Sequence, residues 1–239
     1  MSSIPQKLRR YPRLFDCLNG LARRVGRRTN LFNQIDRVLS GNLPFCFMQI
    51  GANDGISHDP FREFMIRRNA RGVTAEPVPE FFTAMCRNYS SYPQVLPENC
   101  AVGYPAGSLP FYAYSAAFLK SKGDSKELAG LASFNREKLV QCLRPDEDSN
   151  VCIQEIIIPV VTVEDIMVKH GFDQFDCLFM DCEGHEENIL TQLDYEVVKP
   201  RLIVFEHTHY GERAERIEAH LSARGFAFTR LSHDTVAVR

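Results

Sequence analysis

Short apolar runs alternate with segments of helical periodicity along most of the chain. Five of these runs predict core strands, because most of them carry no charge before their last residue. They cover residues 45–50, 72–76, 94–98, 176–181 and 202–206. Helical patterns are found at 60–69, 79–89, 186–193 and 212–223, and another helix begins at Thr162 and ends at Gly171. Strands that alternate with helices predict a parallel sheet with helices on both faces.

Two further strands, at 226–230 and 235–238, form a hairpin at the end of this pattern. The hairpin adds an antiparallel strand, so we expect an α/β fold whose sheet is seven-stranded and mostly parallel. Residues 109–114 and 153–161 also have strand patterns. The polar segment between them, 115–150, is predicted to be an insertion on the substrate side of the sheet.

The first forty residues differ from the rest. Among residues 1–30, eight Lys and Arg side chains face a single Asp, and apolar residues recur at roughly helical spacing. We therefore divide the chain into a basic, amphipathic helical extension at 1–40 and a domain at 41–239. Such a helix either binds an anionic membrane surface or an acidic partner, or packs its apolar stripe on its own domain. The sequence leaves both interpretations of residues 1–30 open.

A glycine-containing turn follows the first core strand, with the sequence Gln49-Ile50-Gly51-Ala52-Asn53-Asp54-Gly55. Asp59 and Pro60 then open a helix as its N-cap and first residue. Strand, glycine turn and helix are typical of nucleotide-binding folds, because glycine lets a ligand approach the backbone closely. The turn lacks the later glycines of G-x-G-x-x-G and the Gly-Lys-Ser/Thr of a P-loop. It resembles motif I of the class I methyltransferases, which passes under the amino-acid end of S-adenosylmethionine (SAM).

The second core strand ends in an acid, Glu76, twenty-one residues after Gly55. A carboxylate at this place in nucleotide-binding folds accepts hydrogen bonds from the two ribose hydroxyls. The turn and the acid together favour an adenosine-type cofactor. The third strand closes at Asn99-Cys100-Ala101, the place where class I methyltransferases bind the edge of the adenine.

Polar residues follow every predicted core strand. They are Gln49 to Gly55, Glu76, Asn99, Asp181 with Glu183 and His185, and Glu206 with His207 and His209. Ligands of parallel sheets bind outside the carboxyl ends of the strands, so we expect these residues to share one site.

The same segments resemble the FkbM-type methyltransferase family over residues 45–239. The most specific of them is Asp181-Cys182-Glu183-Gly184-His185-Glu186. The resemblance implies the class I SAM-methyltransferase fold, which is Rossmann-like, and O-methylation of a sugar, glycoconjugate or small natural product with SAM. The cofactor-binding residues that it implies are Gln49, Gly51, Ala52, Asn53, Asp54, Gly55, Glu76, Pro77, Asn99, Cys100 and Ala101. Many relatives have Asp where Gln49 stands, and an amide carries no charge to pair with the cofactor's ammonium group.

Methyl transfer to a hydroxyl requires alignment of the two reactants and a base that removes the proton. The candidate bases are Asp181, His207 and His185, in that order, and Glu183 is expected to orient the base or to bind a sugar hydroxyl. The other interpretation makes Asp181 a brace for its loop and the histidines ordinary surface residues. Alternatively, a divalent cation would be held by Asp181, Glu183, His207 and His209. Their spacing is not compact enough to demand one, so we expect no metal.

Composition excludes several other classes. A net charge of −2 and a pI of about 6.4 give no general case for nucleic-acid binding. No apolar run approaches the roughly 18 residues of a membrane span. The eight cysteines include no C-x-x-C pair, and no signal peptide precedes them. We therefore expect free thiols and a cytoplasmic location.

Two other function classes stay open. A nicotinamide oxidoreductase has a related sheet, although the missing glycines disfavour it. A non-catalytic module would use the basic N-terminal helix as its binding surface. A nucleic-acid methyltransferase is disfavoured further, because no Asn-Pro-Pro-Tyr-type motif for a flipped base is present. The acceptor, a small molecule or a glycan, and the oligomeric state are not named by the sequence.

Overall fold

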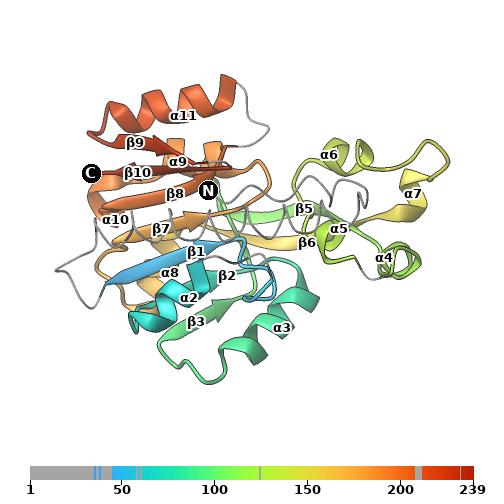
Figure 1. The fold of residues 1–239 in the computed structure, drawn as a ribbon, viewed down its shortest axis with the longest axis horizontal. Coiled ribbons are helices and arrows are strands. Elements are labelled where there is room, and N and C mark those ends of the chain that lie inside the picture. The colour runs from blue at the N-terminus through green and yellow to red at the C-terminus, as the bar shows by residue number, and fades with distance from the viewer. Residues whose placement is uncertain are drawn as a thin grey trace, which may run out of the picture.

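The computed structural model describes residues 35, 38, 45–57, 59, 61–123, 125–207, 212–231 and 233–239 (Figure 1). Of the predicted N-terminal extension, these residues include only Ile35 and Val38. Pro60 and His209 also lie outside the described residues.

A seven-stranded sheet forms the centre of the domain, with the strand order β3-β2-β1-β7-β8-β10-β9 (Figure 1). Its strands are β1 (Cys46–Ile50), β2 (Arg71–Ala75), β3 (Val95–Glu98), β7 (Cys177–Met180), β8 (Leu202–Glu206), β9 (Ala227–Arg230) and β10 (Asp234–Val238). Neighbouring strands pair in parallel from β3 to β8, whereas β10 is antiparallel to both of its neighbours. The predicted α/β fold class, with its antiparallel C-terminal strand, is confirmed.

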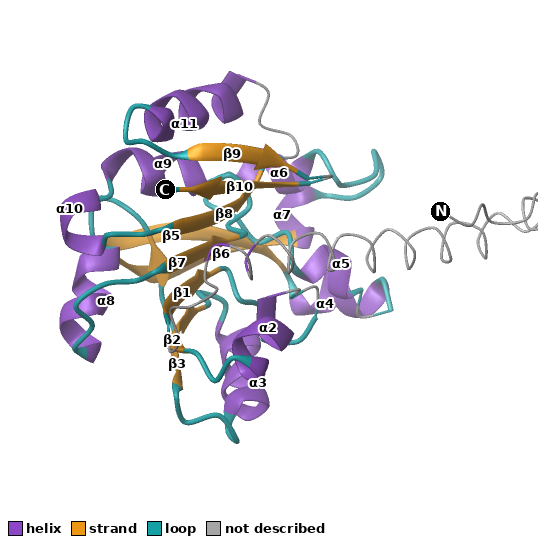
Figure 2. Cartoon of the chain, turned by 60° about the vertical axis from the view of Figure 1, so that its left-hand side comes forward, coloured by secondary structure: helices purple, strands orange, loops and turns teal. Residues whose placement is uncertain are grey.

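Helices cover both faces of this sheet (Figure 2). They are α2 (Phe61–Arg67), α3 (Pro79–Tyr89), α8 (Val163–His170), α9 (Glu186–Gln192), α10 (Tyr195–Val198) and α11 (Glu212–Ser222). Successive residues of a strand point to opposite faces, so β1 contributes to two cores. Phe47 packs against Phe61 of α2, with ring centroids 5.8 Å apart. Met48 joins Ile166 of α8 on the other face.

Side-chain caps define two of these helices as the sequence predicts. One carboxylate oxygen of Asp59 accepts the N–H groups of Phe61 (2.9 Å) and Arg62 (3.0 Å) at the start of α2. Thr162 forms a capping box with Asp165 at the start of α8. These caps satisfy backbone donors that have no partner inside a helix.

A second, three-stranded sheet extends from the large one, with the order β4-β6-β5 (Figure 1). It consists of β4 (Ala101–Val102), β5 (Gly107–Tyr114) and β6 (Ile153–Val161). Between β5 and β6 the chain forms the short helices α4 (Ala116–Ser121), α5 (Lys126–Ala129), α6 (Arg136–Val140) and α7 (Ser149–Cys152). The sequence predicted the two long strands but not their pairing, because partners such as Tyr112 and Glu155 lie far apart in the chain.

Helices within the described ranges are all too short or too polar to span a bilayer. The seven cysteines at described positions are free thiols.

Candidate active site

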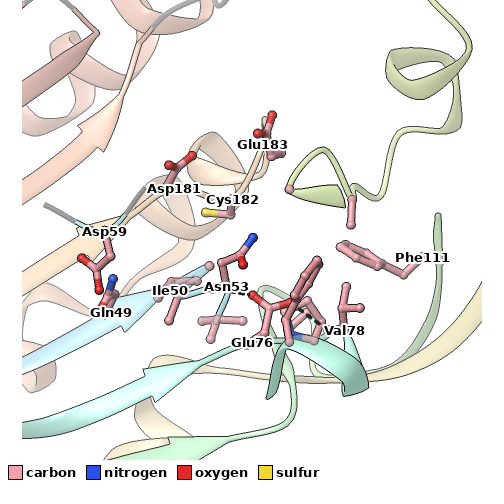
Figure 3. Close-up of a pocket in the computed structure, with 18 of the residues that line it drawn as sticks. Gln49, Ile50, Asn53, Asp59, Glu76, Val78, Phe111, Asp181, Cys182 and Glu183 are labelled. Carbon is pink, nitrogen blue, oxygen red and sulfur yellow. Dashed lines mark hydrogen bonds between the residues drawn. The ribbon is translucent and has the colours of Figure 1, made fainter. Parts of the chain in front are cut away.

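A cavity of about 340 Å³ opens at the carboxyl ends of β1, β2, β7 and β8 (Figure 3). Four segments of the large sheet line it: residues 49–53, 76–78 and 181–183, and Glu206. The three-stranded sheet and its insertion supply Cys100, Ala101, Val102, Phe111, Ala129, Gly130, Ala132 and Phe134 to the wall. Strand ends from distant parts of the chain therefore meet at one edge of the sheet, as the sequence predicts.

The glycine turn packs closely against the ends of the two strands that flank β1, which are β2 and β7. Gly51 has a φ of +77°, and a Cβ atom there would lie 1.9 Å from the carbonyl oxygen of Asp181. The N–H of Gly51 donates to Ala75 (3.0 Å), and the N–H of Asp181 donates to Ile50 (3.0 Å). Only glycine fits between these strand ends, so the cavity floor at this point is bare backbone.

Glu76 is fixed by two backbone donors at one end of the cavity. Its carboxylate accepts the N–H of Asn53 (2.8 Å) and the N–H of Val78 (2.9 Å). Asn53 itself has a left-handed backbone, with a φ of +51°. Glu76 is only 5 % exposed, and this burial raises its pKa to about 7. Each carboxylate oxygen keeps a second lone pair for a ligand.

Three carboxylates lie together at the other strand ends: Asp181, Glu183 and Glu206. Asp181 is open to the cavity, and the surrounding protein and the nearby acids, Glu206 first, raise its pKa well above the ordinary value. Burial and the charge of Glu183 raise the pKa of Glu206 to about 7. A carboxylate with a raised pKa is a stronger base than an ordinary one, so both groups are candidates to accept a proton.

The loop after β7 is held in place by another acid, Glu186. This side chain is fully buried and accepts the N–H groups of Cys182 (2.8 Å) and Gly184 (3.1 Å). Glu183 connects the same loop to the insertion, because it forms an ion pair with Lys138 of α6. Its carbonyl oxygen also accepts the Ser133 hydroxyl (3.2 Å). The position of Glu183 therefore depends on both the loop after β7 and the insertion.

Neither candidate histidine lines the cavity. The ring of His185 packs on that of Phe134, with centroids 4.4 Å apart, and burial lowers its pKa. Its Nε2 has no hydrogen-bond partner within the described residues and lies close to Gly103. Nδ1 of His207 is 3.1 Å from the hydroxyl of Thr235. Among the four predicted catalytic residues, only the two carboxylates reach the cavity wall.

Eight of the predicted cofactor-binding residues line the cavity: Gln49, Gly51, Ala52, Asn53, Glu76, Pro77, Cys100 and Ala101. Asp54, Gly55 and Asn99 do not. The Asp54 carboxylate accepts the N–H groups of Ile56 and Ser57 and closes the turn. Gly55 packs on the ring of Tyr89. The Asn99 amide donates to the carbonyl oxygens of Glu76 (2.9 Å) and Pro77 (3.2 Å), so it braces the wall from behind.

Sequence reasoning missed part of the wall. Asp59, assigned only as a helix cap, also lines the cavity. Phe111 and Phe134 form an aromatic face, with ring centroids 5.0 Å apart and nearly perpendicular planes. The apolar residues 131–134 within a polar insertion were the available signal for Phe134. No signal distinguished Phe111 from an ordinary strand residue.

No group of three or more His, Cys, Asp or Glu side chains in the described part of the chain is placed to hold a metal ion.

The sheet order and the cavity at its carboxyl edge define a class I SAM-methyltransferase fold. Residues 49–228 match the model of the methyltransferase FkbM domain, and the chain belongs to that family. This confirms the family expected from the sequence motifs.

Two solved structures are similar to this chain. The crystal structure of methyltransferase FkbM from Methylobacillus flagellatus KT is 15% identical, with a TM-score of 0.50 over 84% of this chain and 46% of that one. The chain thus spans less than half the length of that protein. Aeropyrum pernix fibrillarin, crystallised with natively bound S-adenosyl-L-methionine, is 10% identical, with a TM-score of 0.42 over 82% of this chain and 66% of that one. Curated proteins gave no match.

We predict that Gly51→Ala destabilises the protein far more than Gly123→Ala. Both glycines have positive φ, so both substitutions incur a cost of about 1–2 kcal/mol for the left-handed backbone. Only at Gly51 would the new methyl group meet another atom, the Asp181 carbonyl oxygen, because no atom lies within 4 Å of a Cβ at Gly123. Urea unfolding of both variants measures the difference, and equal losses would contradict the packing described for the turn.

We also predict that Glu206→Gln stabilises the protein increasingly as the pH rises. The pKa of Glu206 is raised from 4.5 to about 7, so between these values the folded protein keeps a proton that the unfolded chain has lost. Wild-type stability therefore falls with pH across this window, and Gln removes that loss. The expected gain is on the order of 1–2 kcal/mol at pH 8 after solvent screening in the cavity.

Thermal unfolding from pH 4.5 to pH 8 measures this gain. The control is Glu80→Gln, which replaces an exposed carboxylate at the start of α3. A difference between variant and wild type that is independent of pH would argue against the raised pKa of Glu206.

Proposed function

We propose that this protein is a SAM-dependent O-methyltransferase whose acceptor is a hydroxyl group of a sugar, a glycoconjugate or a small natural product. The observation that carries the proposal is the arrangement of acids around one cavity. A backbone-fixed carboxylate, Glu76, lies at the end of β2, and carboxylates with raised pKa values follow β7 and β8. Glu76 is suited to bind the ribose of a nucleoside, and the carboxylates after β7 and β8 are suited to remove a proton.

The residues present fit SAM. Glu76 would accept hydrogen bonds from the ribose hydroxyls through its remaining lone pairs, with Cys100 and Ala101 beside the adenine. The bare backbone at Gly51 leaves room for close approach of the cofactor. When bound, SAM supplies an electrophilic methyl group to the reaction.

Asp181 is the residue that we assign as the base. Its carboxylate is open to the cavity, and its raised pKa makes it a stronger base than an ordinary carboxylate toward an acceptor hydroxyl. A proton on Asp181 is stabilised because the charges of Glu206 and Glu183 disfavour the ionised form. Glu206 is the second group that can hold this proton, since burial and nearby acids raise its pKa to about 7.

The aromatic face supports the choice of acceptor class. Phe111 and Phe134 line the cavity together with Phe81. Apolar ring faces pack against the C–H faces of a sugar, while carboxylates bind its hydroxyl groups. Both kinds of surface are present in this cavity, and both exclude water when an acceptor fills them.

We predict that Glu76→Gln lowers the affinity for SAM at least tenfold, because an amide can accept only one of the two backbone N–H bonds and loses its charge. The matched control is Glu98→Gln at the end of the neighbouring strand β3, which pairs with Lys169 and His170 away from the cavity wall. We expect this control to change the affinity less than twofold. Isothermal titration of each variant with SAM, and of the wild type with NADH, measures these affinities.

Binding of NADH in place of SAM would overturn the methyltransferase proposal in favour of an oxidoreductase. Equal losses in the two glutamate variants would mean that Glu76 has no special role in holding the cofactor.

Asp181→Asn is predicted to reduce the rate of methyl transfer a hundredfold or more while SAM still binds, because general-base catalysis commonly contributes this much. His207→Gln is the comparison, and its rate should stay within threefold of the wild type because His207 lies outside the cavity wall. Formation of S-adenosylhomocysteine with a panel of methyl glycosides provides the assay. If His207→Gln abolished activity and Asp181→Asn did not, the assignment of the base would be wrong.

A further inference from the structure

A buried polar pair, Gln49 and Asp59, lies at the end of the cavity away from Glu76 (Figure 3). Gln49 comes from the end of β1, and Asp59 precedes α2. Both side chains line the cavity, although they are only 2 % and 7 % exposed. The amide of Gln49 donates a hydrogen bond to the Asp59 carboxylate.

The pair has more acceptor capacity than the protein uses. One oxygen of Asp59 accepts two N–H groups of α2, and the other accepts the Tyr89 hydroxyl at a long 3.4 Å. Oε1 of Gln49 has no hydrogen-bond partner within the described residues. Among those residues, no Lys or Arg forms an ion pair with Asp59. A buried carboxylate without a counter-charge is costly, and this burial raises the pKa of Asp59.

We propose that Asp59 and Gln49 form a binding subsite for a primary ammonium group, and that this group is the α-amino group of the cofactor. The inference rests on the proposed function. An ammonium ion offers a positive charge and three donors, which match a carboxylate and an unpaired amide oxygen.

The order of residues along the cavity supports this assignment. Figure 3 shows Ile50 and Asn53 between the Gln49–Asp59 pair and Glu76. With the ribose at Glu76, the rest of an extended cofactor reaches the opposite end of the cavity. Gln49 brings no charge to that end, so Asp59, ten residues later in the chain, supplies the carboxylate instead.

Helix capping alone does not explain Asp59. Asn caps helices about as well as Asp, so a purely structural role predicts that Asp59→Asn is harmless to ligand binding. A subsite for a cation predicts a loss, because the amide cannot neutralise an ammonium group.

Three ligands test the inference by calorimetric titration of the full-length protein. S-adenosylhomocysteine carries the ammonium and carboxylate groups, 5′-S-(3-aminopropyl)-5′-thioadenosine carries the amine alone, and 5′-methylthioadenosine carries neither. We expect Asp59→Asn to lower the affinity for both amine-bearing ligands at least tenfold. The affinity for 5′-methylthioadenosine should change less than twofold. Gln49→Met removes Oε1 and the amide donor to Asp59 but keeps the Asp59 carboxylate and its bonds to the N–H groups of α2, and it should show the same selectivity with a smaller loss.

The control is Asp194→Asn, because Asp194 caps α10 through two backbone N–H groups in the same way and lies outside the cavity wall. It should leave all three affinities within twofold of the wild type. Thermal unfolding of each variant verifies folding.

Two results would overturn the inference while leaving the proposed function intact: equal losses for all three ligands in Asp59→Asn, or unchanged affinities in both Asp59→Asn and Gln49→Met. A wild-type protein that bound none of the ligands would overturn the proposed function and, with it, this inference.

Discussion

Backbone hydrogen bonds at the end of β1 bring the acids that follow β2 and β7 to the same edge of the sheet. Gly51 and Ala52 both donate to the carbonyl oxygen of Ala75 on β2, at 3.0 and 3.1 Å, and Asp181 donates to Ile50 at 3.0 Å. Three parallel strands thus end at the same level, with no room for a side chain on Gly51. Because these strands end side by side, Glu76 after β2 and Asp181 after β7 face the same cavity, although more than a hundred residues of sequence separate them.

The acids around this space fall into two groups that differ in their hydrogen bonds. Glu76 and Glu186 each accept two backbone N–H groups and so hold the loops that form the cavity wall. Asp181 and Glu206 accept no hydrogen bond from the described residues, and surrounding protein and like charges raise their pKa values. Backbone donors lower the pKa of a carboxyl group, but burial outweighs them at Glu76, whose pKa is also raised to about 7. The two groups therefore differ in how they are held: backbone donors fix Glu76 and Glu186, whereas Asp181 and Glu206 accept no such bonds.

The sequence predicted most of what depends on local patterns. The core strands, the caps at Asp59 and Thr162, and the placement of Glu76 on the cavity follow from apolar runs, N-cap residues and strand ends. It could not predict the three-stranded sheet, because β5 and β6 pair across more than thirty intervening residues and no local pattern encodes that pairing. It also could not orient His185, whose ring is held by Phe134 from that same insertion. Side-chain direction at a helix start depends on tertiary neighbours that no local pattern encodes.

The separate hydrogen bonding of the three-stranded sheet affects how this family can diversify. None of its strands pairs with a strand of the seven-stranded sheet in the described part of the chain, yet its residues form one wall of the cavity. Its contacts with the loop after β7 include the side chains of Ser133 and Lys138 at Glu183 and the ring of Phe134 on His185. Substitutions in the three-stranded sheet and its insertion can thus change one wall of the cavity, while the strand pairing of the seven-stranded sheet stays intact.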